Sequence, residues 1–88
     1  MADGAAWIEA FLEMMAGERA SARNTLTAYA RDLADAQAFL KPRGHDLASA
    51  GAEAIEAYFA ALSARAMASA TAARRRSAVR QFYRFVLG

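Results

Sequence analysis

The chain has 88 residues, which is enough for one small domain and too few for two. Its hydrophobic content of 57% is dominated by alanine, and with one proline and five glycines this composition favours an all-α fold. Because there is no cysteine, a disulfide framework and a thiolate metal site are both excluded, while the net charge is only +2.

Two amphipathic helices are predicted in the first half of the chain. In residues 4–16 the large apolar side chains recur at spacings of three and four, and this pattern stops near Gly17. The same spacing continues in residues 21–40, where Ser21 is a candidate N-cap and Pro42 prevents a further turn. Each stretch is therefore expected to bury one face against the rest of the chain.

The start of the second predicted helix carries polar and cationic side chains on its exposed side. These groups are of the kind that contact phosphates or base edges, namely Arg23, Asn24, Thr27 and Arg31. Asp32 and Asp35 follow in the second half of the helix, where carboxylates would repel a polyanion. Any DNA-binding surface should therefore be confined to its first turns.

A connector with several helix breakers, residues 41–51, precedes a third predicted helix over residues 52–64. His45 is the only histidine, and it has no second ligand at metal-binding spacing. We therefore interpret His45 as an exposed loop residue. A short turn over residues 65–68 then leads into a fourth helix.

The fourth predicted helix, residues 69–87, carries two different surfaces. At about 100° per residue its larger apolar side chains form one stripe, and its polar side chains lie opposite. Ser69 and Thr71 are candidate N-caps at its start. A helix N-terminus followed one turn later by Arg74 and Arg75 suits a phosphate, because free N–H groups and positive charge meet there.

Charge is distributed unevenly along the chain. All nine acidic residues lie in the first 56 residues beside five of the eleven Lys and Arg, which gives that part a net charge of −4. The last 32 residues carry +6 and no carboxylate. A merely solvated helix usually alternates its charges to form i,i+4 pairs, and the fourth helix forms none internally. Its positive charge is therefore predicted to serve a polyanion outside the chain.

The sequence contains no arrangement typical of an enzyme active site. There is no glycine-rich phosphate loop, no nucleophile triad with a histidine and no metal-ligand cluster, so we expect neither catalysis nor a cofactor nor a metal. The N-terminus lacks the basic region of a signal peptide, and no uncharged apolar run approaches the roughly 18 residues of a membrane span. A cytoplasmic location is therefore expected.

Two stretches resemble the N-terminal core-binding domain of tyrosine recombinases, particularly of the Xer and phage-integrase type. Residues 21–33, S-A-R-N-T-L-T-A-Y-A-R-D-L, are similar to that domain's S-x-x-T-L-x-A-Y-x-x-D-L segment. Residues 70–87, A-T-A-A-R-R-R-S-A-V-R-Q-F-Y-R-F-V-L, resemble its last helix, S-T-x-x-R-R-L-S-A-x-R-x-F-Y-x-F-L. The two stretches occur in the expected order and separation, and the likeness covers essentially the whole chain.

The resemblance implies a compact four-helix SAM-like bundle that lies on one side of double-stranded DNA, with the starts of the second and fourth helices near the major groove. Carried over by position, it points to Asn24, Thr25, Thr27, Ser69, Thr71, Arg74, Arg75 and Ser77 as DNA contacts. Periodicity alone adds Arg23 and Arg31, and Arg80 is a further candidate phosphate contact.

The resemblance also implies that catalysis belongs to a separate C-terminal domain, which contains the tyrosine nucleophile. Tyr29, Tyr58 and Tyr83 lie on apolar stripes and are not expected to be that nucleophile. Residues 1–88 are therefore predicted to be one DNA-binding domain without catalytic residues. Its expected partners are double-stranded DNA, its own catalytic domain and other recombinase protomers, with no membrane.

Several residues depart from the family pattern. Arg76 stands where the family usually has leucine, and its charge is costly in a core unless the side chain extends to water. Ala30 replaces a common basic residue, Ala36 a larger apolar one and Ala66 a frequent glycine. We expect a thinner core, marginal stability and weak DNA binding.

Two other functions remain open from the sequence. Phe85 projects to the polar side of its helix, and with Phe82 and Val86 it would form an apolar end that docks a partner protein. A basic amphipathic helix on an anionic membrane is the second alternative, but it needs Phe82 and Val86 free to insert. Replacement of Arg74 and Arg75 by alanine separates DNA binding from protein docking, because only DNA binding needs their charge.

Overall fold

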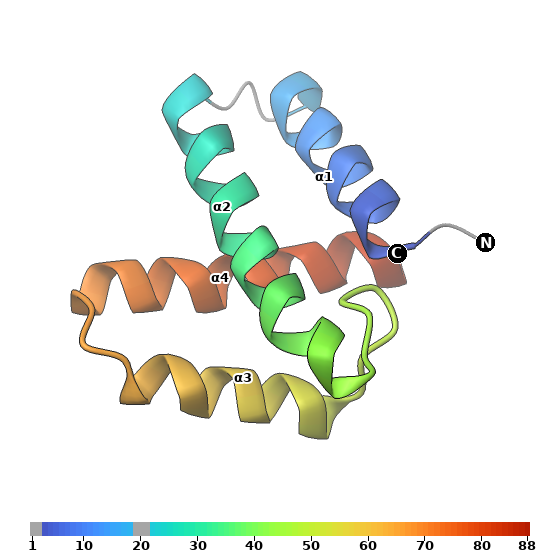
Figure 1. Cartoon of the computed structure of the whole chain (residues 1–88). Helices are drawn as coiled ribbons and strands as arrows, with labels where there is room; N and C mark the ends of the chain where they lie inside the picture. The colour runs from blue at the N-terminus through green and yellow to red at the C-terminus, as the bar shows by residue number, and fades with distance from the viewer. Residues whose placement is uncertain (1–2, 19–21) are drawn as a thin grey trace.

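The structure is a computed structural model that describes residues 3–18 and 22–88. Over these residues it contains four α-helices, a short 3₁₀ turn and no strand, which confirms the all-α expectation (Figure 1). The elements are α1 (Gly4–Glu18), α2 (Arg23–Leu40), η1 (Lys41–Arg43), α3 (Ala52–Ala64) and α4 (Ser69–Leu87).

The four helices form two crossed pairs. Helices α1 and α2 lie side by side, and α3 and α4 lie across them, with α4 passing between α1 and α3 (Figure 1). Helices α2 and α4 each contact the other three helices, and their most extensive contact is with each other, so the crossing of α2 and α4 is the centre of the domain. The Cα radius of gyration of 12.5 Å is close to the roughly 12 Å expected for a compact domain of this length.

Every helix contributes large apolar side chains to one core. Phe11 of α1 and Phe82 of α4 are almost completely buried, and their rings meet edge to face with centroids 5.9 Å apart. Leu33 of α2 and Tyr58 of α3 are fully buried beside them in the same cluster. Because burial of each such side chain contributes about 1.5–3 kcal/mol, this cluster supplies the main driving force for folding.

The helix boundaries agree with the periodic pattern, but the two predicted caps of α4 are wrong. Helix α4 begins at Ser69, and its N-cap is Ala68, which makes no side-chain hydrogen bond. The Ala72 N–H already donates to the Ala68 carbonyl, so the Ser69 and Thr71 hydroxyls lie inside the first turn rather than before it. The predicted cap at Ser21 lies outside the described residues.

The connector after α2 is tied to the start of α1. Asp46 Oδ1 accepts hydrogen bonds from the Gly4 backbone N–H (3.1 Å) and from Gln37 Nε2 (2.9 Å), while Gln37 Oε1 accepts one from the Leu47 N–H (2.7 Å). Gly4 is buried, and a Cβ at this position would lie 2.5 Å from Gln37 Nε2. Only glycine allows this close approach without displacing the amide.

The prediction that Phe85 faces away from the bundle is wrong. Its ring contacts Trp7 edge to face, with centroids 6.0 Å apart, and lies 5.7 Å from Phe11. Helix α1 crosses the C-terminal half of α4. It therefore contacts side chains over a wider arc of the α4 surface than the apolar stripe occupies. Among the described residues, the one large hydrophobic side chain that is strongly exposed is Leu87.

Candidate nucleic-acid interface

The crossing of α2 and α4 is built on a buried carboxylate. Asp32, in the middle of α2, is completely buried, and Arg74, one turn into α4, binds it with two hydrogen bonds. Arg74 Nε donates to Asp32 Oδ2 at 2.8 Å and Arg74 Nη2 donates to Oδ1 at 2.9 Å. Two parallel hydrogen bonds of this kind fix the guanidinium in one plane.

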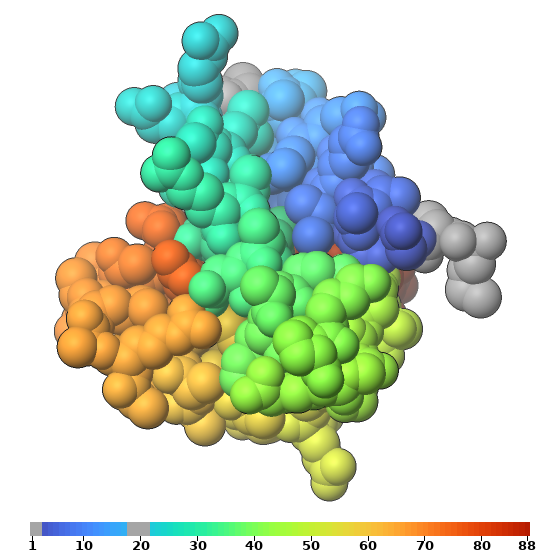
Figure 2. Space-filling view, viewed as in Figure 1, coloured from blue at the N-terminus to red at the C-terminus, as the bar shows by residue number. Residues whose placement is uncertain are grey.

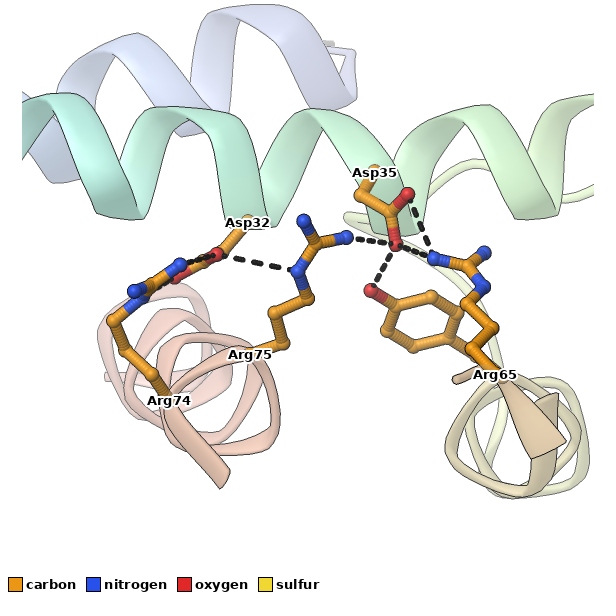
Figure 3. A network of polar contacts seen from close by, with 6 residues as sticks. Asp32, Asp35, Arg65, Arg74 and Arg75 are labelled. Atoms are coloured by element: carbon orange, nitrogen blue, oxygen red, sulfur yellow. Dashed lines mark hydrogen bonds and ion pairs between the residues drawn. The ribbon is translucent and has the colours of Figure 1, made fainter. Parts of the chain in front are cut away.

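A second carboxylate extends the same network toward α3 (Figure 3). Asp35 accepts a hydrogen bond from the Tyr58 hydroxyl at 2.7 Å and two from Arg65 Nη1, at 2.8 and 3.0 Å. Arg75 lies between the two acids, with Nη1 2.9 Å from Asp35 Oδ2 and Nε 3.5 Å from Asp32 Oδ1. The network joins α2, α3 and α4 and carries a net charge of +1.

These contacts keep the charged forms in place. Partial burial by itself would raise the pKa of Asp35, but hydrogen bonds from Tyr58, Arg65 and Arg75 outweigh it, so the pKa lies below its ordinary value. The hydrogen bond to Asp32 raises the pKa of Arg74 further above its ordinary range. Burial and the adjacent Asp35 carboxylate raise the pKa of Tyr58, which therefore stays a neutral hydrogen-bond donor.

The first turns of α2 are exposed and project from the bundle (Figure 2). Arg23 and Asp32 are nine residues apart, so the level of α2 where Arg74 binds lies about 14 Å along the axis from the first helical residue. That separation is close to the roughly 12 Å width of the DNA major groove. The exposed side chains on these turns are Arg23, Asn24, Thr25, Thr27 and Arg31.

The polar residues of α4 differ in what they contact. Gln81 Nε2 donates to Ser77 Oγ at 3.0 Å and to Tyr29 Oη at 3.1 Å, which makes a second polar link to α2. The Arg80 guanidinium lies over the Phe59 ring, 5.4 Å from the ring centroid, and Arg80 is exposed. Ser69 is exposed and Thr71 is half-buried at the start of the helix.

Known proteins provide an independent comparison. Residues 8–87 match the family described as phage integrase, N-terminal SAM-like domain. The chain belongs to this family. No solved structure matches the chain.

Relatives of this SAM-like domain include tyrosine recombinases, and the chain spans less than a third of their length. It is 70% identical over 88 residues to tyrosine recombinase XerD of Caulobacter vibrioides, covering all of this chain and 29% of that protein. It is 49% identical over 82 residues to tyrosine recombinase XerD of Rhizobium meliloti, covering 93% of this chain and 26% of that protein. The resemblance noted in the sequence is thereby confirmed.

Two arginines of α4 in this SAM-like domain have carboxylate partners elsewhere in the chain. Helix α4 contains no carboxylate of its own, as the sequence shows, but Arg74 and Arg75 pair with Asp32 and Asp35. Those acids come from α2, about forty residues earlier, so a search for i,i+4 partners within α4 could not find them. The available signal was the presence of Asp32 and Asp35 on the second predicted helix and of an arginine run without any carboxylate on the fourth.

The structure also places residues that the sequence left uncertain. Arg76 extends out of the SAM-like core and donates from Nη2 to Ser63 Oγ at 2.7 Å, so its charge is not buried without a partner. Ala36 is fully buried, and His45 is exposed as expected. Arg84, which is not among the predicted DNA contacts, is exposed one turn beyond Arg80 and adds a cation to that side of α4.

Two features that could suggest another activity are absent from residues 3–18 and 22–88. No group of histidine, aspartate and glutamate side chains there is placed to hold a metal ion. None of these helices is both long and apolar enough to cross a membrane.

Proposed function

We propose that this chain is the DNA-binding N-terminal domain of a XerD-type tyrosine recombinase and that it holds duplex DNA at a recombination site. The observation that supports this most directly is the arrangement of α2 and α4. The Asp32–Arg74 contact brings the start of α4 against α2, about one major-groove width from the exposed cationic first turn of α2. Two cationic surfaces at that spacing suit the phosphates on either side of a groove.

Different residues have different roles in this proposal. Arg23, Arg31, Arg74, Arg80 and Arg84 contribute positive charge toward backbone phosphates, with Ser69 and Thr71 as further donors near the start of α4. Asn24, Thr25 and Thr27 lie on the exposed turns of α2, where amide and hydroxyl groups can read base edges. Ser77 contributes a hydroxyl that Gln81 already orients.

Strand cleavage is proposed to come from a separate catalytic domain of the recombinase. The three tyrosines here have structural roles that do not suit a nucleophile. Tyr58 is fully buried, and burial raises the pKa of Tyr83 to about 12 while its hydroxyl donates to the Leu47 carbonyl. Tyr29 Oη accepts a hydrogen bond from Gln81. Residues 1–88 would thus act as one non-catalytic domain that works with the catalytic domain and other recombinase protomers in the cytoplasm.

Duplex binding at several salt concentrations tests the proposal. The 88-residue chain should bind duplex DNA at low ionic strength, with an affinity that falls steeply as salt is added, because each neutralised phosphate releases counterions. Arg23→Gln and Arg31→Gln should each weaken binding and lower the slope of log K against log salt by about 1.

A matched control removes the same charge from η1, at the other end of α2. Arg43 lies just after α2, where its guanidinium stacks on Phe39 at 3.7 Å and donates to the Phe39 carbonyl. Arg43→Gln should leave the salt slope unchanged. Binding that does not respond to salt, or that weakens equally in all three variants, would contradict the proposed interface.

A further inference from the structure

Arg74 offers a second hydrogen-bonding edge that Asp32 does not use. A guanidinium has five N–H groups, and Asp32 takes the edge formed by Nε and Nη2. Nη1 and the second N–H of Nη2 form another edge, which can bind an oxyanion in the same bidentate way. The Arg74 side chain is 40% exposed, so this edge is within reach of a ligand in solution.

Asp32 is a rigid support for that guanidinium. It is completely buried, both of its oxygens bind Arg74, and Arg75 Nε lies 3.5 Å from Oδ1. A free surface arginine loses rotamer freedom when it binds a phosphate. Arg74 has already lost this freedom in the folded chain, so it would bind a phosphate without that entropic cost.

Arg75 has a different role, although it is the next residue. Its side chain is 20% exposed, it lies between Asp32 and Asp35, and its Nε is buried without a hydrogen bond of good geometry. Both carboxylates therefore offset its charge. Arg75 stabilises the crossing of α2 and α4, and its contribution to DNA affinity is smaller than that of Arg74.

From this geometry we infer that Asp32 is a positioning residue for DNA binding: it orients Arg74 so that the outer edge of the guanidinium takes a backbone phosphate. The inference rests on the proposed function and adds a buried acid to the DNA-binding apparatus. It also reverses the simplest electrostatic expectation, in which any acidic residue weakens the binding of a polyanion.

The sign of one substitution tests the inference. Asp32→Asn keeps the size of the side chain and removes its negative charge, so long-range electrostatics alone predicts tighter DNA binding. Loss of positioning predicts weaker binding, by about tenfold if one charge-assisted hydrogen-bonded contact is lost. Glu56→Gln, which removes an exposed acid from α3, is the control and should bind as tightly as the unsubstituted chain or slightly more tightly. Circular dichroism at the binding temperature establishes that each variant is folded.

A double-mutant cycle assigns the effect to Arg74. If Asp32 acts through Arg74, then Asp32→Asn should cost nothing in a chain that already carries Arg74→Gln. Equal losses in both backgrounds would overturn the inference. Lysine keeps the positive charge but cannot bind a carboxylate and a phosphate through two planar edges. The variant Arg74→Lys therefore tests the inference with Asp32 in place. It should lose about as much affinity as Arg74→Gln, and unchanged affinity would overturn the inference.

The outcomes also separate this inference from the proposed function. Tighter binding by Asp32→Asn, together with weaker binding by Arg74→Gln, would remove the positioning role and leave DNA binding intact. A chain that binds no duplex DNA at low salt would instead overturn the proposed function itself.

Discussion

Helix α4 is held by two different kinds of contact along its length. Its first half meets α2 through Arg74 and a buried carboxylate, whereas its second half packs Phe82 and Phe85 against the aromatic rings of α1. The apolar half gains free energy by removing surface from water. The charged half must first offset the cost of burying Asp32, so it contributes less net stability but fixes one arrangement of the two helices. Stability and orientation are thus assigned to opposite halves of one helix.

Removal of the central ring of the apolar half should produce the largest effect. Phe82 is completely buried and touches Phe11 edge to face. Phe82→Ala should lower the free energy of unfolding by about 3–5 kcal/mol, because the lost ring leaves a cavity that α1 and α4 cannot fill. Urea denaturation followed by circular dichroism measures this. Leu87→Ala, at a position that is 83% exposed, should change stability by less than about 0.5 kcal/mol.

Removal of the α2 carboxylate that the charged half of α4 binds should lower the free energy of unfolding somewhat less. Asp32→Ala leaves Arg74 and Arg75 without one of their partners, and loss of one member of a buried ion pair costs about 3–5 kcal/mol. Arg74 can regain water because it is partly exposed, so a loss of about 2–3 kcal/mol is expected. Glu56→Ala is the exposed control for the same denaturation experiment. If Asp32→Ala lowered the free energy of unfolding as much as Phe82→Ala does, the charged half of α4 would contribute as much to stability as the apolar half.

A substitution that disturbs the contact between α1 and the connector should lower stability by a smaller amount. A second glycine of α1 serves as a control, for which the expected change in stability has the opposite sign. Gly4→Ala places a Cβ 2.5 Å from Gln37 Nε2 and 2.8 Å from Asp46 Oδ1, and it should destabilise the fold by about 1–2 kcal/mol. A Cβ at Gly17, also in α1, would have no heavy atom within 4 Å beyond its chain neighbours and the backbone of its own helical turn. Gly17→Ala should therefore stabilise the chain by up to about 1 kcal/mol through helix propensity. A similar loss in both variants would contradict the close-approach explanation.

The sequence allowed prediction of the helices more fully than of the contacts between them. The 3.6-residue repeat predicted the four helices, and α3 and α4 have the expected bounds, because the pattern depends only on local spacing. The pairing of Asp32 with Arg74 was missed because it depends on how two helices cross. Phe85 was placed wrongly for the same reason, since the arc that α1 covers is a tertiary property. Exposure of Arg23 and Asn24 followed from the pattern, but what they bind does not.

Acid should lower the stability of the chain, and the contributions of Asp35 and Asp46 to that loss can be measured separately. Asp35 and Asp46 both have pKa values below the ordinary value of 3.8: partial burial opposes the shift, and hydrogen bonds that favour the carboxylates outweigh it. A carboxylate whose pKa is lower in the folded than in the unfolded chain stabilises the fold above its unfolded pKa, and that contribution is lost as pH falls through the folded value. The free energy of unfolding should therefore decrease as the pH falls below about 4.

Two substitutions assign that decrease to its sources. Asp35→Asn removes the contribution made through Arg65 and Arg75, and Asp46→Asn removes the one made through Gly4 and Gln37. Each variant should be less stable at neutral pH and should show a shallower acid dependence in urea titrations. If Asp35→Asn leaves the acid dependence unchanged while Asp46→Asn flattens it, then the contacts of Asp35 with Arg65 and Arg75 do not favour its charged form over the form that it has in water.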